Sequence, residues 1–125
     1  MTHEDVQGWL DRYVDAWRSY DESAIASLFT DDVEYRYHPW DEPVRGRDAV
    51  VAEWLKPENH DDPGAWQAEY RPWAVEDTRA VAVGTSRYDD ANGKREYHNV
   101  FLIEFDDDGW CRSFTEVYAL RPAGR

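Results

Sequence analysis

Apolar residues recur every three or four positions near the start of the chain, and this spacing predicts a helix with one buried face. The stripe consists of Val6, Trp9, Leu10, Tyr13, Val14 and Trp17. Thr2 and Asp5 predict a capping box at its start, with aspartate in place of glutamate. Asp21 is placed to cap a second, short helix. The buried residues of that helix would be Ile25, Leu28 and Phe29.

Alternation of apolar and polar residues predicts the strands. The first covers Val33–His38 and is stopped by Pro39. After a loop, the apolar spacing predicts a third helix over Arg47–Leu55, and a polar segment, Pro57–Gly64, is expected to be an exposed loop. Four further strands are predicted over 66–75, 80–88, 97–105 and 110–120, separated by turn signals such as Asp90-Ala91-Asn92-Gly93.

The resulting element order is α-α-β-α-β-β-β-β. Helices gathered at the front and a meander behind them predict an α+β fold, with the helices on one face of a curved antiparallel sheet. The length of 125 residues fits a single domain spanning 1–125, without repeats or linkers.

Charge and cysteine content narrow the function classes. Lys and Arg number 14 against 27 Asp and Glu, a net charge of −13, which disfavours binding to nucleic acid or to anionic membrane surfaces. Cys111 is the single cysteine, so no internal disulfide can form and a reducing compartment is the default. The acidic start of the chain resembles neither a signal peptide nor a membrane span, and we therefore expect a cytoplasmic protein.

Three stretches of the chain resemble one superfamily. They are Arg12-Tyr13-Val14 with Ala26–Asp32 (ASLFTDD), Pro43–Val50 (PVRGRDAV), and Asp108-Gly109 leading to Phe114–Tyr118 (FTEVY). Together they resemble the SnoaL-like, or nuclear transport factor two-like, superfamily, which includes polyketide cyclases and ketosteroid isomerases. The resemblance implies a cone-shaped sheet curled around the first helix, with an apolar pocket inside. Because members of this superfamily differ widely in activity, the resemblance does not settle the chemistry.

Individual positions can be carried over from that resemblance. Tyr13 falls where steroid isomerases place a tyrosine that donates to a developing oxyanion. His38 falls where they place the general base, although a one-residue difference in strand length leaves open whether Tyr37 or His38 faces inward. Phe101 occupies the position of their second, acidic donor, and Glu116 corresponds to a catalytic aspartate of limonene epoxide hydrolases. The catalytic residues of the steroid isomerases are incomplete in this chain, and so are those of the limonene epoxide hydrolases. We therefore do not expect steroid isomerisation by the residues that those isomerases use.

Glu116 is the strongest candidate for proton transfer. On the predicted last strand it alternates with Phe114, Tyr118 and Leu120, and an acid among large apolar side chains would be desolvated. Desolvation raises the pKa of a carboxyl toward neutrality and suits it to general acid–base work. The structural alternative is an ion pair between Glu116 and an arginine.

Other candidates surround this acid. His38 is a second candidate base, or else a strand-end histidine in water. His98 and Asn99 must face opposite ways, and the resemblance favours Asn99 inward, where it could orient a ligand or hydrogen-bond at the surface instead. An aromatic lining is expected from Tyr13, Trp17, Tyr35, Tyr37 and Tyr118, whose hydroxyl groups are more typical of a ligand pocket than of a dry core.

No metal site is expected. The histidines show no paired spacing, and His60-Asp61-Asp62 lies in the loop predicted to be solvated. Asp106-Asp107-Asp108-Gly109 lacks the spaced ligands of an EF-hand and is interpreted as a turn. Cys111 has no evident partner for nucleophilic chemistry.

The leading hypothesis is a small-molecule pocket protein of the SnoaL-like group. As an enzyme it would act without a cofactor, as an isomerase, dehydratase, hydrolase or cyclase on a hydrophobic, oxygenated substrate. The alternatives are a non-catalytic ligand-binding or dimerisation module and a purely structural dimer, and the sequence does not decide whether the protein is an enzyme. A homodimer is compatible with all of these, through a sheet face that carries Val81, Val83, Val100 and Leu102. An anionic ligand would meet an unfavourable charge unless Arg71 or Arg87 points inward.

Overall fold

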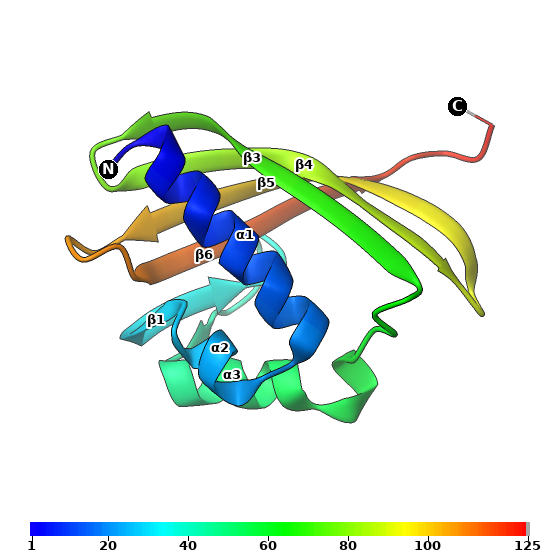
Figure 1. Ribbon diagram of the computed structural model, residues 1–125, viewed down its shortest axis with the longest axis horizontal. Helices are drawn as coiled ribbons and strands as arrows, with labels where there is room; N and C mark the ends of the chain where they lie inside the picture. The colour runs from blue at the N-terminus through cyan, green and yellow to red at the C-terminus, as the bar shows by residue number, and fades with distance from the viewer. Residues whose placement is uncertain (125) are drawn as a thin grey trace.

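Three helices precede most of a curved six-stranded sheet in the computed structural model, which describes residues 1–124. The long helix α1 crosses one face of the sheet, while α2, α3 and β1 lie together at one edge (Figure 1). This arrangement confirms the predicted α+β class. The elements are α1 (His3–Ser19), α2 (Glu22–Ala26), β1 (Phe29–Arg36), β2 (Val44–Arg45), α3 (Arg47–Leu55), the 3-10 turn η1 (Pro57–Asn59), β3 (Trp66–Glu76), β4 (Arg79–Asp90), β5 (Gly93–Phe105) and β6 (Cys111–Leu120).

Both predicted helix caps are present. The Thr2 hydroxyl accepts a hydrogen bond from the Asp5 amide at 3.1 Å, and the Thr2 amide donates to the Asp5 carboxylate at 2.8 Å. The Asp21 carboxylate accepts from the Ala24 amide at 3.0 Å. Each cap satisfies backbone N–H groups that a helix start leaves without partners. Tyr20, with a φ of 50°, ends α1 in the left-handed conformation and turns the chain toward α2.

The strand order is β2-β1-β6-β5-β4-β3, and the sheet is mixed rather than wholly antiparallel. Strands β3 to β6 form the expected antiparallel meander, but β1 pairs parallel to β6. Alternating burial reports which face a residue occupies and carries no information about strand direction, so the sequence did not reveal this pair. The short strand β2, expected as loop, pairs with β1 through Tyr35 and Val44.

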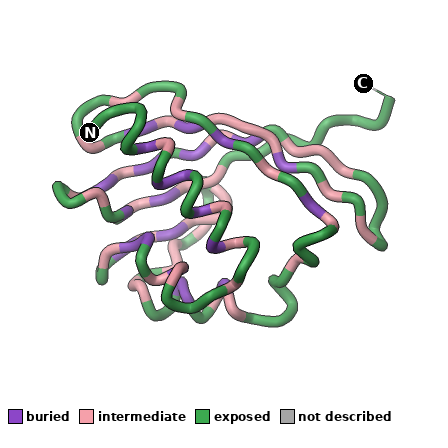
Figure 2. The backbone as a smooth tube through the Cα atoms, in the orientation of Figure 1, coloured by how far each residue is buried: buried purple, intermediate pink, exposed green. Residues whose placement is uncertain are grey.

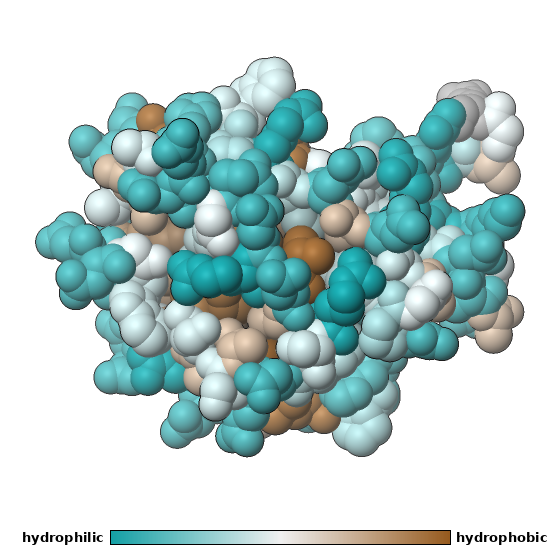
Figure 3. Space-filling view, viewed as in Figure 1, coloured by the Kyte–Doolittle hydropathy of each residue, from teal (hydrophilic) through white to brown (hydrophobic). Residues whose placement is uncertain are grey.

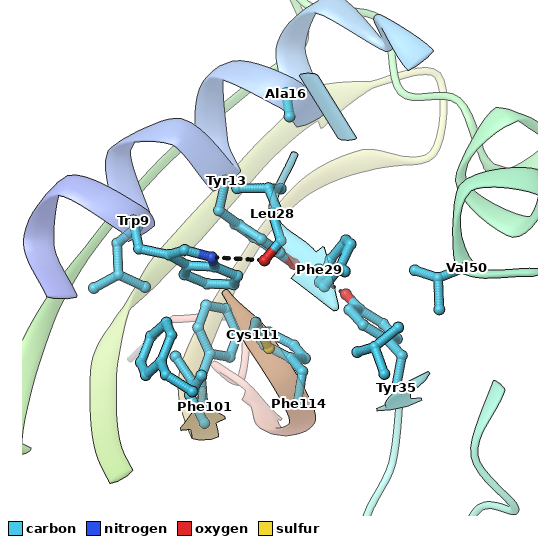
Figure 4. Close-up of a cluster of buried hydrophobic side chains, with 14 of the residues drawn as sticks. Trp9, Tyr13, Ala16, Leu28, Phe29, Tyr35, Val50, Phe101, Cys111 and Phe114 are labelled. Atoms are coloured by element: carbon cyan, nitrogen blue, oxygen red, sulfur yellow. Dashed lines mark hydrogen bonds between the residues drawn. The ribbon is translucent and has the colours of Figure 1, made fainter. Parts of the chain in front are cut away.

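The core lies between α1 and the sheet. Buried residues alternate along the strands beneath α1 (Figure 2). Trp9 is at the centre, where its indole N–H donates to the Leu28 carbonyl at 3.1 Å (Figure 4). The fully buried aromatic residues around it are Phe29, Phe101, Phe105 and Phe114. Each such side chain contributes about 1.5–3 kcal/mol by leaving water.

Hydrophilic residues cover much of the face that carries α1, with small hydrophobic areas between them (Figure 3). The opposite face of the sheet carries a row of paired apolar residues, Val83 with Val100 and Val100 with Val117. Leu102, beside this row, is 46% exposed. Within residues 1–124, no helix has the length and apolar character needed to cross a membrane.

Candidate functional site

A cavity of about 250 Å³ lies on the α1 side of the sheet, beyond the aromatic core. We call it the inner cavity. It adjoins a hollow of about 260 Å³, the mouth, with which it shares Asp61, Ser86, Tyr88, Asn99 and Glu116. The inner cavity is lined by Tyr13, Trp17, Tyr20, Tyr35, Tyr37, Trp54, Asn59, Asp61, Tyr70, Ser86, Tyr88, Asn99 and Glu116. The mouth adds Arg95, Tyr97 and Tyr118.

Strand β6 leads from the core to this site. Alternate residues share a sheet face, so Phe114, Glu116 and Tyr118 all point to the α1 side. Phe114 is fully buried, Glu116 lines both parts of the cavity, and Tyr118 at the mouth is 44% exposed. Opposite them on β5, Phe101 pairs with Glu116 and Asn99 pairs with Tyr118. The register therefore places Asn99 and Glu116 in neighbouring positions of one wall.

The Glu116 carboxylate is desolvated and unpaired. Within residues 1–124 it has no hydrogen bond or salt bridge, so the alternative of an arginine ion pair is not found. Burial raises its pKa from 4.5 to about 7, while a positive charge on His38 acts in the opposite direction. Near neutral pH the group is divided between its two protonation states, and it can either accept or donate a proton.

Tyr13 and Tyr35 form a hydroxyl pair, with their oxygens 3.2 Å apart. Both rings stack on Phe114, Tyr13 at 5.4 Å and Tyr35 at 4.7 Å between ring centroids. Burial raises the pKa of both hydroxyls well above the usual value, and the nearby Glu116 charge raises it further. Both are therefore neutral. One of the two hydroxyl protons forms the hydrogen bond between the Tyr13 and Tyr35 oxygens. The other hydroxyl proton remains free to donate to a ligand.

Asn99 and Ser86 supply a second polar pair. The Ser86 hydroxyl donates to the Asn99 side-chain carbonyl at 3.1 Å, and both residues are buried. That bond orients the amide so that its two N–H donors remain available to the cavity. His98, the neighbour of Asn99, lies on the other face, where it is exposed and contacts Glu96 at 2.9 Å.

The structure places Tyr37, and not His38, in the lining. The Tyr37 ring packs against Tyr35 at 5.0 Å, with an interplanar angle of 67°. Tyr37 continues the inward alternation of Val33 and Tyr35, although β1 itself ends at Arg36. His38 lies beside the mouth, with Nδ1 2.8 Å from the Asp41 carboxylate and Nε2 3.1 Å from the Tyr118 hydroxyl. It can therefore act on the cavity only through Tyr118 and through its charge.

The loop after α3 contributes a residue that sequence reasoning missed. Asp61 was expected in a solvated loop, but it is half-buried and lines the cavity. Its carboxylate accepts a hydrogen bond from the Trp17 indole at 3.1 Å, and its amide donates to the Tyr20 hydroxyl at 2.8 Å. Two aromatic residues at the end of α1 thus hold the loop against the cavity. The indole N–H of Trp17, on the stripe predicted to be buried, indicates that a hydrogen-bond acceptor lies nearby. The sequence does not show which residue supplies that acceptor.

Tyr70 and Tyr88 were also missed, although the inward alternation of their strands could have indicated them. Tyr70 depends on Gly84, which faces it across the β3–β4 pair. A Cβ at Gly84 would lie 2.5 Å from Tyr70 Cδ1 and 2.8 Å from Tyr70 Cα. Glycine therefore lets the Tyr70 ring lie over β4 on its way into the cavity.

The arginines and the cysteine that the sequence raised as candidates lie outside the inner cavity. Arg71 is exposed, and Arg87 is exposed and bound to Glu96 at 2.9 Å. Within residues 1–124, no three His, Cys, Asp or Glu side chains gather as metal ligands. Cys111 is buried in the core, and burial raises the pKa of its thiol.

Comparisons with known proteins agree with this architecture. The family profile of the SnoaL-like domain matches residues 10–113. An NTF2-like protein of unknown function from Cytophaga hutchinsonii superposes with a TM-score of 0.65 and 19% identity, over 90% of this chain and 98% of that one. An LEH-like epoxide hydrolase from M. tuberculosis superposes with a TM-score of 0.68 and 12% identity, over 94% of this chain and 84% of that one. Such identities show likeness of fold alone. No functionally curated protein matches the sequence.

Proposed function

The chain belongs to the family of SnoaL-like domains, and from that basis we propose that it binds a small hydrophobic, oxygenated molecule in the inner cavity and catalyses a proton transfer on it. The observation that carries this proposal is the Glu116 carboxyl, which lies in the wall without a partner among residues 1–124 and has a pKa of about 7. A merely structural acid would be paired or solvated. An unpaired one at neutral pKa is suited to exchange a proton with a ligand.

The proposed step begins with ionised Glu116 removing a proton from a carbon next to a carbonyl group. The electron pair of the broken C–H bond moves to the carbonyl oxygen, which becomes an enolate. The free proton of the Tyr13–Tyr35 pair stabilises that oxygen, and the Asn99 amide offers a second donor. Return of the proton from Glu116 to the same or another carbon restores a neutral product and the starting enzyme.

His38 has a supporting role in this proposal. Its ring is held between Asp41 and the Tyr118 hydroxyl, beside the mouth, and its positive charge would favour the ionised form of Glu116. We therefore expect His38 to be a positioning residue. Its replacement by glutamine should raise the pH at which Glu116 becomes active as a base, while leaving proton transfer possible.

Deuterium exchange tests the proposal without knowledge of the natural substrate. 2-Tetralone, a bicyclic aromatic ketone, is incubated in D2O, and loss of its α-hydrogen NMR signals is followed. We expect the protein to accelerate exchange and Glu116→Gln to abolish the acceleration. Glu69→Gln is the matched control, because Glu69 is on the outer face of β3 with its side chain 80% exposed. Ligand binding without any accelerated exchange would favour the non-catalytic binding module instead.

A homodimer is a separate part of the proposal. Val83, Val100 and Val117 form a row across three strands on the face opposite α1, and Leu102 beside them is 46% exposed. Exposed apolar surface of this kind is typical of protein–protein contact. The interface would leave the inner cavity of each protomer on the other side of its sheet.

A further inference from the structure

The inner cavity combines negative charge with aromatic walls. Of its 13 lining residues, eight are Tyr or Trp and two are carboxylic acids, while none of these described residues is Lys, Arg or His. The mouth contributes Arg95, but both terminal nitrogens of its guanidinium bind the Asp90 carboxylate, at 2.8 and 3.1 Å. Among residues 1–124, therefore, no cationic side chain forms a salt bridge with either acid of the cavity, and the charges of His38, His60 and Arg95 act on these acids only from farther away.

Asp61 is the second acid of the lining, and among residues 1–124 it too lacks a cationic partner within salt-bridge distance. One of its carboxylate oxygens accepts the Trp17 indole N–H, and no other hydrogen bond or salt bridge reaches the carboxylate within residues 1–124. Burial raises the pKa of Asp61 and the negative charge of Asp90 raises it further, while the Trp17 hydrogen bond and the positive charges of Arg95 and His60 act in the opposite direction. Desolvation of a carboxylate is costly unless a cation or several donors compensate it. A positively charged ligand would provide that compensation.

The aromatic rings next to Asp61 already attract cations of the chain itself. The Arg18 guanidinium lies 4.3 Å from the centroid of the Trp66 ring, which in turn stacks on Trp17 at 3.7 Å. The Arg95 guanidinium lies 5.0 Å from the centroid of the Tyr88 ring. Electron-rich ring faces bind cations by about 0.5–2 kcal/mol, and more strongly as water is excluded. Trp17, Tyr20 and Tyr88 contribute such rings to the lining that includes Asp61, and one face of the Tyr20 ring stacks on His60 at 3.9 Å.

We propose that the molecule bound in the inner cavity is an organic cation, a protonated or quaternary amine, whose nitrogen lies at Asp61 among the rings of Trp17, Tyr20 and Tyr88. This inference rests on the proposed function and adds the charge of its substrate. The oxygenated part of the molecule then extends toward Glu116 and the Tyr13–Tyr35 pair, which belong to the same lining. The net charge of −13 attracts the same class of ligand from solution.

Two probes of equal shape test the proposal. 4-(Trimethylammonio)phenol carries the positive charge, and 4-tert-butylphenol replaces its nitrogen with carbon while keeping the ring and hydroxyl. Both are titrated into the protein at neutral pH and physiological salt, and binding is followed by calorimetry and by the NMR signal of the Trp17 indole. We expect the cation to bind at least about tenfold more tightly than its neutral counterpart.

Asp61→Asn and Asp62→Asn separate the site from the overall charge. Both changes remove one negative charge from the same loop, but Asp62 is exposed and does not line the cavity. We expect Asp61→Asn to weaken binding of the cation about tenfold and to leave 4-tert-butylphenol unaffected, while Asp62→Asn changes neither.

Three results would overturn the inference: equal affinity for the two probes, equal effects of the two variants, or no binding of the cation at millimolar concentration. If both probes shift the Trp17 indole signal with equal affinity, the cation proposal fails but the proposed function still stands. Deuterium exchange of 2-tetralone, a neutral ketone, tests that function independently. Failure of the cation proposal and failure of the proton-transfer proposal are therefore distinguishable.

Discussion

Replacing Glu116 with glutamine should alter how stability depends on pH. The pKa of this carboxyl is about 7 in the folded protein and 4.5 in its ordinary, solvated state. The folded protein therefore holds a proton that the unfolded chain releases, and stability falls as pH rises between the two values. With about 1.4 kcal/mol for each pKa unit, the ionised carboxylate destabilises the fold by about 3 kcal/mol above pH 7. Below pH 4.5 this penalty is absent.

Urea unfolding followed by tryptophan fluorescence measures the effect. The glutamine variant lacks the ionisation, so the free energy of unfolding of the variant minus that of the wild type should increase by about 2–3 kcal/mol between pH 5 and pH 8. Glu69→Gln, on the outer face, should show no such increase. A difference between wild type and Glu116→Gln that is the same at both pH values would refute the reasoning, because it would mean that Glu116 ionises alike in the folded and unfolded states.

Three other substitutions test separate parts of the account. Gly84→Ala should destabilise the protein by about 3 kcal/mol or more in urea unfolding, because its Cβ would lie 2.5 Å from Tyr70 Cδ1; an unchanged midpoint would contradict this contact. Tyr13→Phe should slow exchange of 2-tetralone about a hundredfold by removing a donor of the Tyr13–Tyr35 pair, and unaltered exchange would exclude that role. Leu102→Lys should convert a dimer to a monomer in sedimentation velocity, whereas a wild type that is already monomeric would refute the proposed interface.

Local patterns in the sequence predicted much of the fold. The stripe of α1 and the caps at Thr2 and Asp21 depend on residues within one or two turns, and each formed as expected. Alternation on the last strand likewise brought Glu116 to the wall beside the core. These features could be predicted because neighbouring residues alone determine them.

Features that join distant segments were not predictable in the same way. The parallel pairing of β1 with β6 has no hairpin to specify it, and the two-residue strand β2 is too short to show alternation. Asp61 looked like an ordinary loop acid because its burial comes from Trp17, 44 positions earlier in the chain. For His38, the sequence left open whether it or Tyr37 faces inward, and the inward alternation of Val33 and Tyr35 continues to Tyr37 and not to His38.

The most direct test of the central claim, that the inner cavity binds small molecules, is NMR mapping of 2-tetralone on the 15N-labelled protein. Trp17 and Asn99 line the cavity, and each carries a side-chain N–H signal, whereas Trp73 is 68% exposed outside it. We predict saturable shifts of the Trp17 and Asn99 side-chain signals, with Trp73 unchanged. Shifts confined to Trp73, or the absence of any shift at Trp17 and Asn99, would contradict the account.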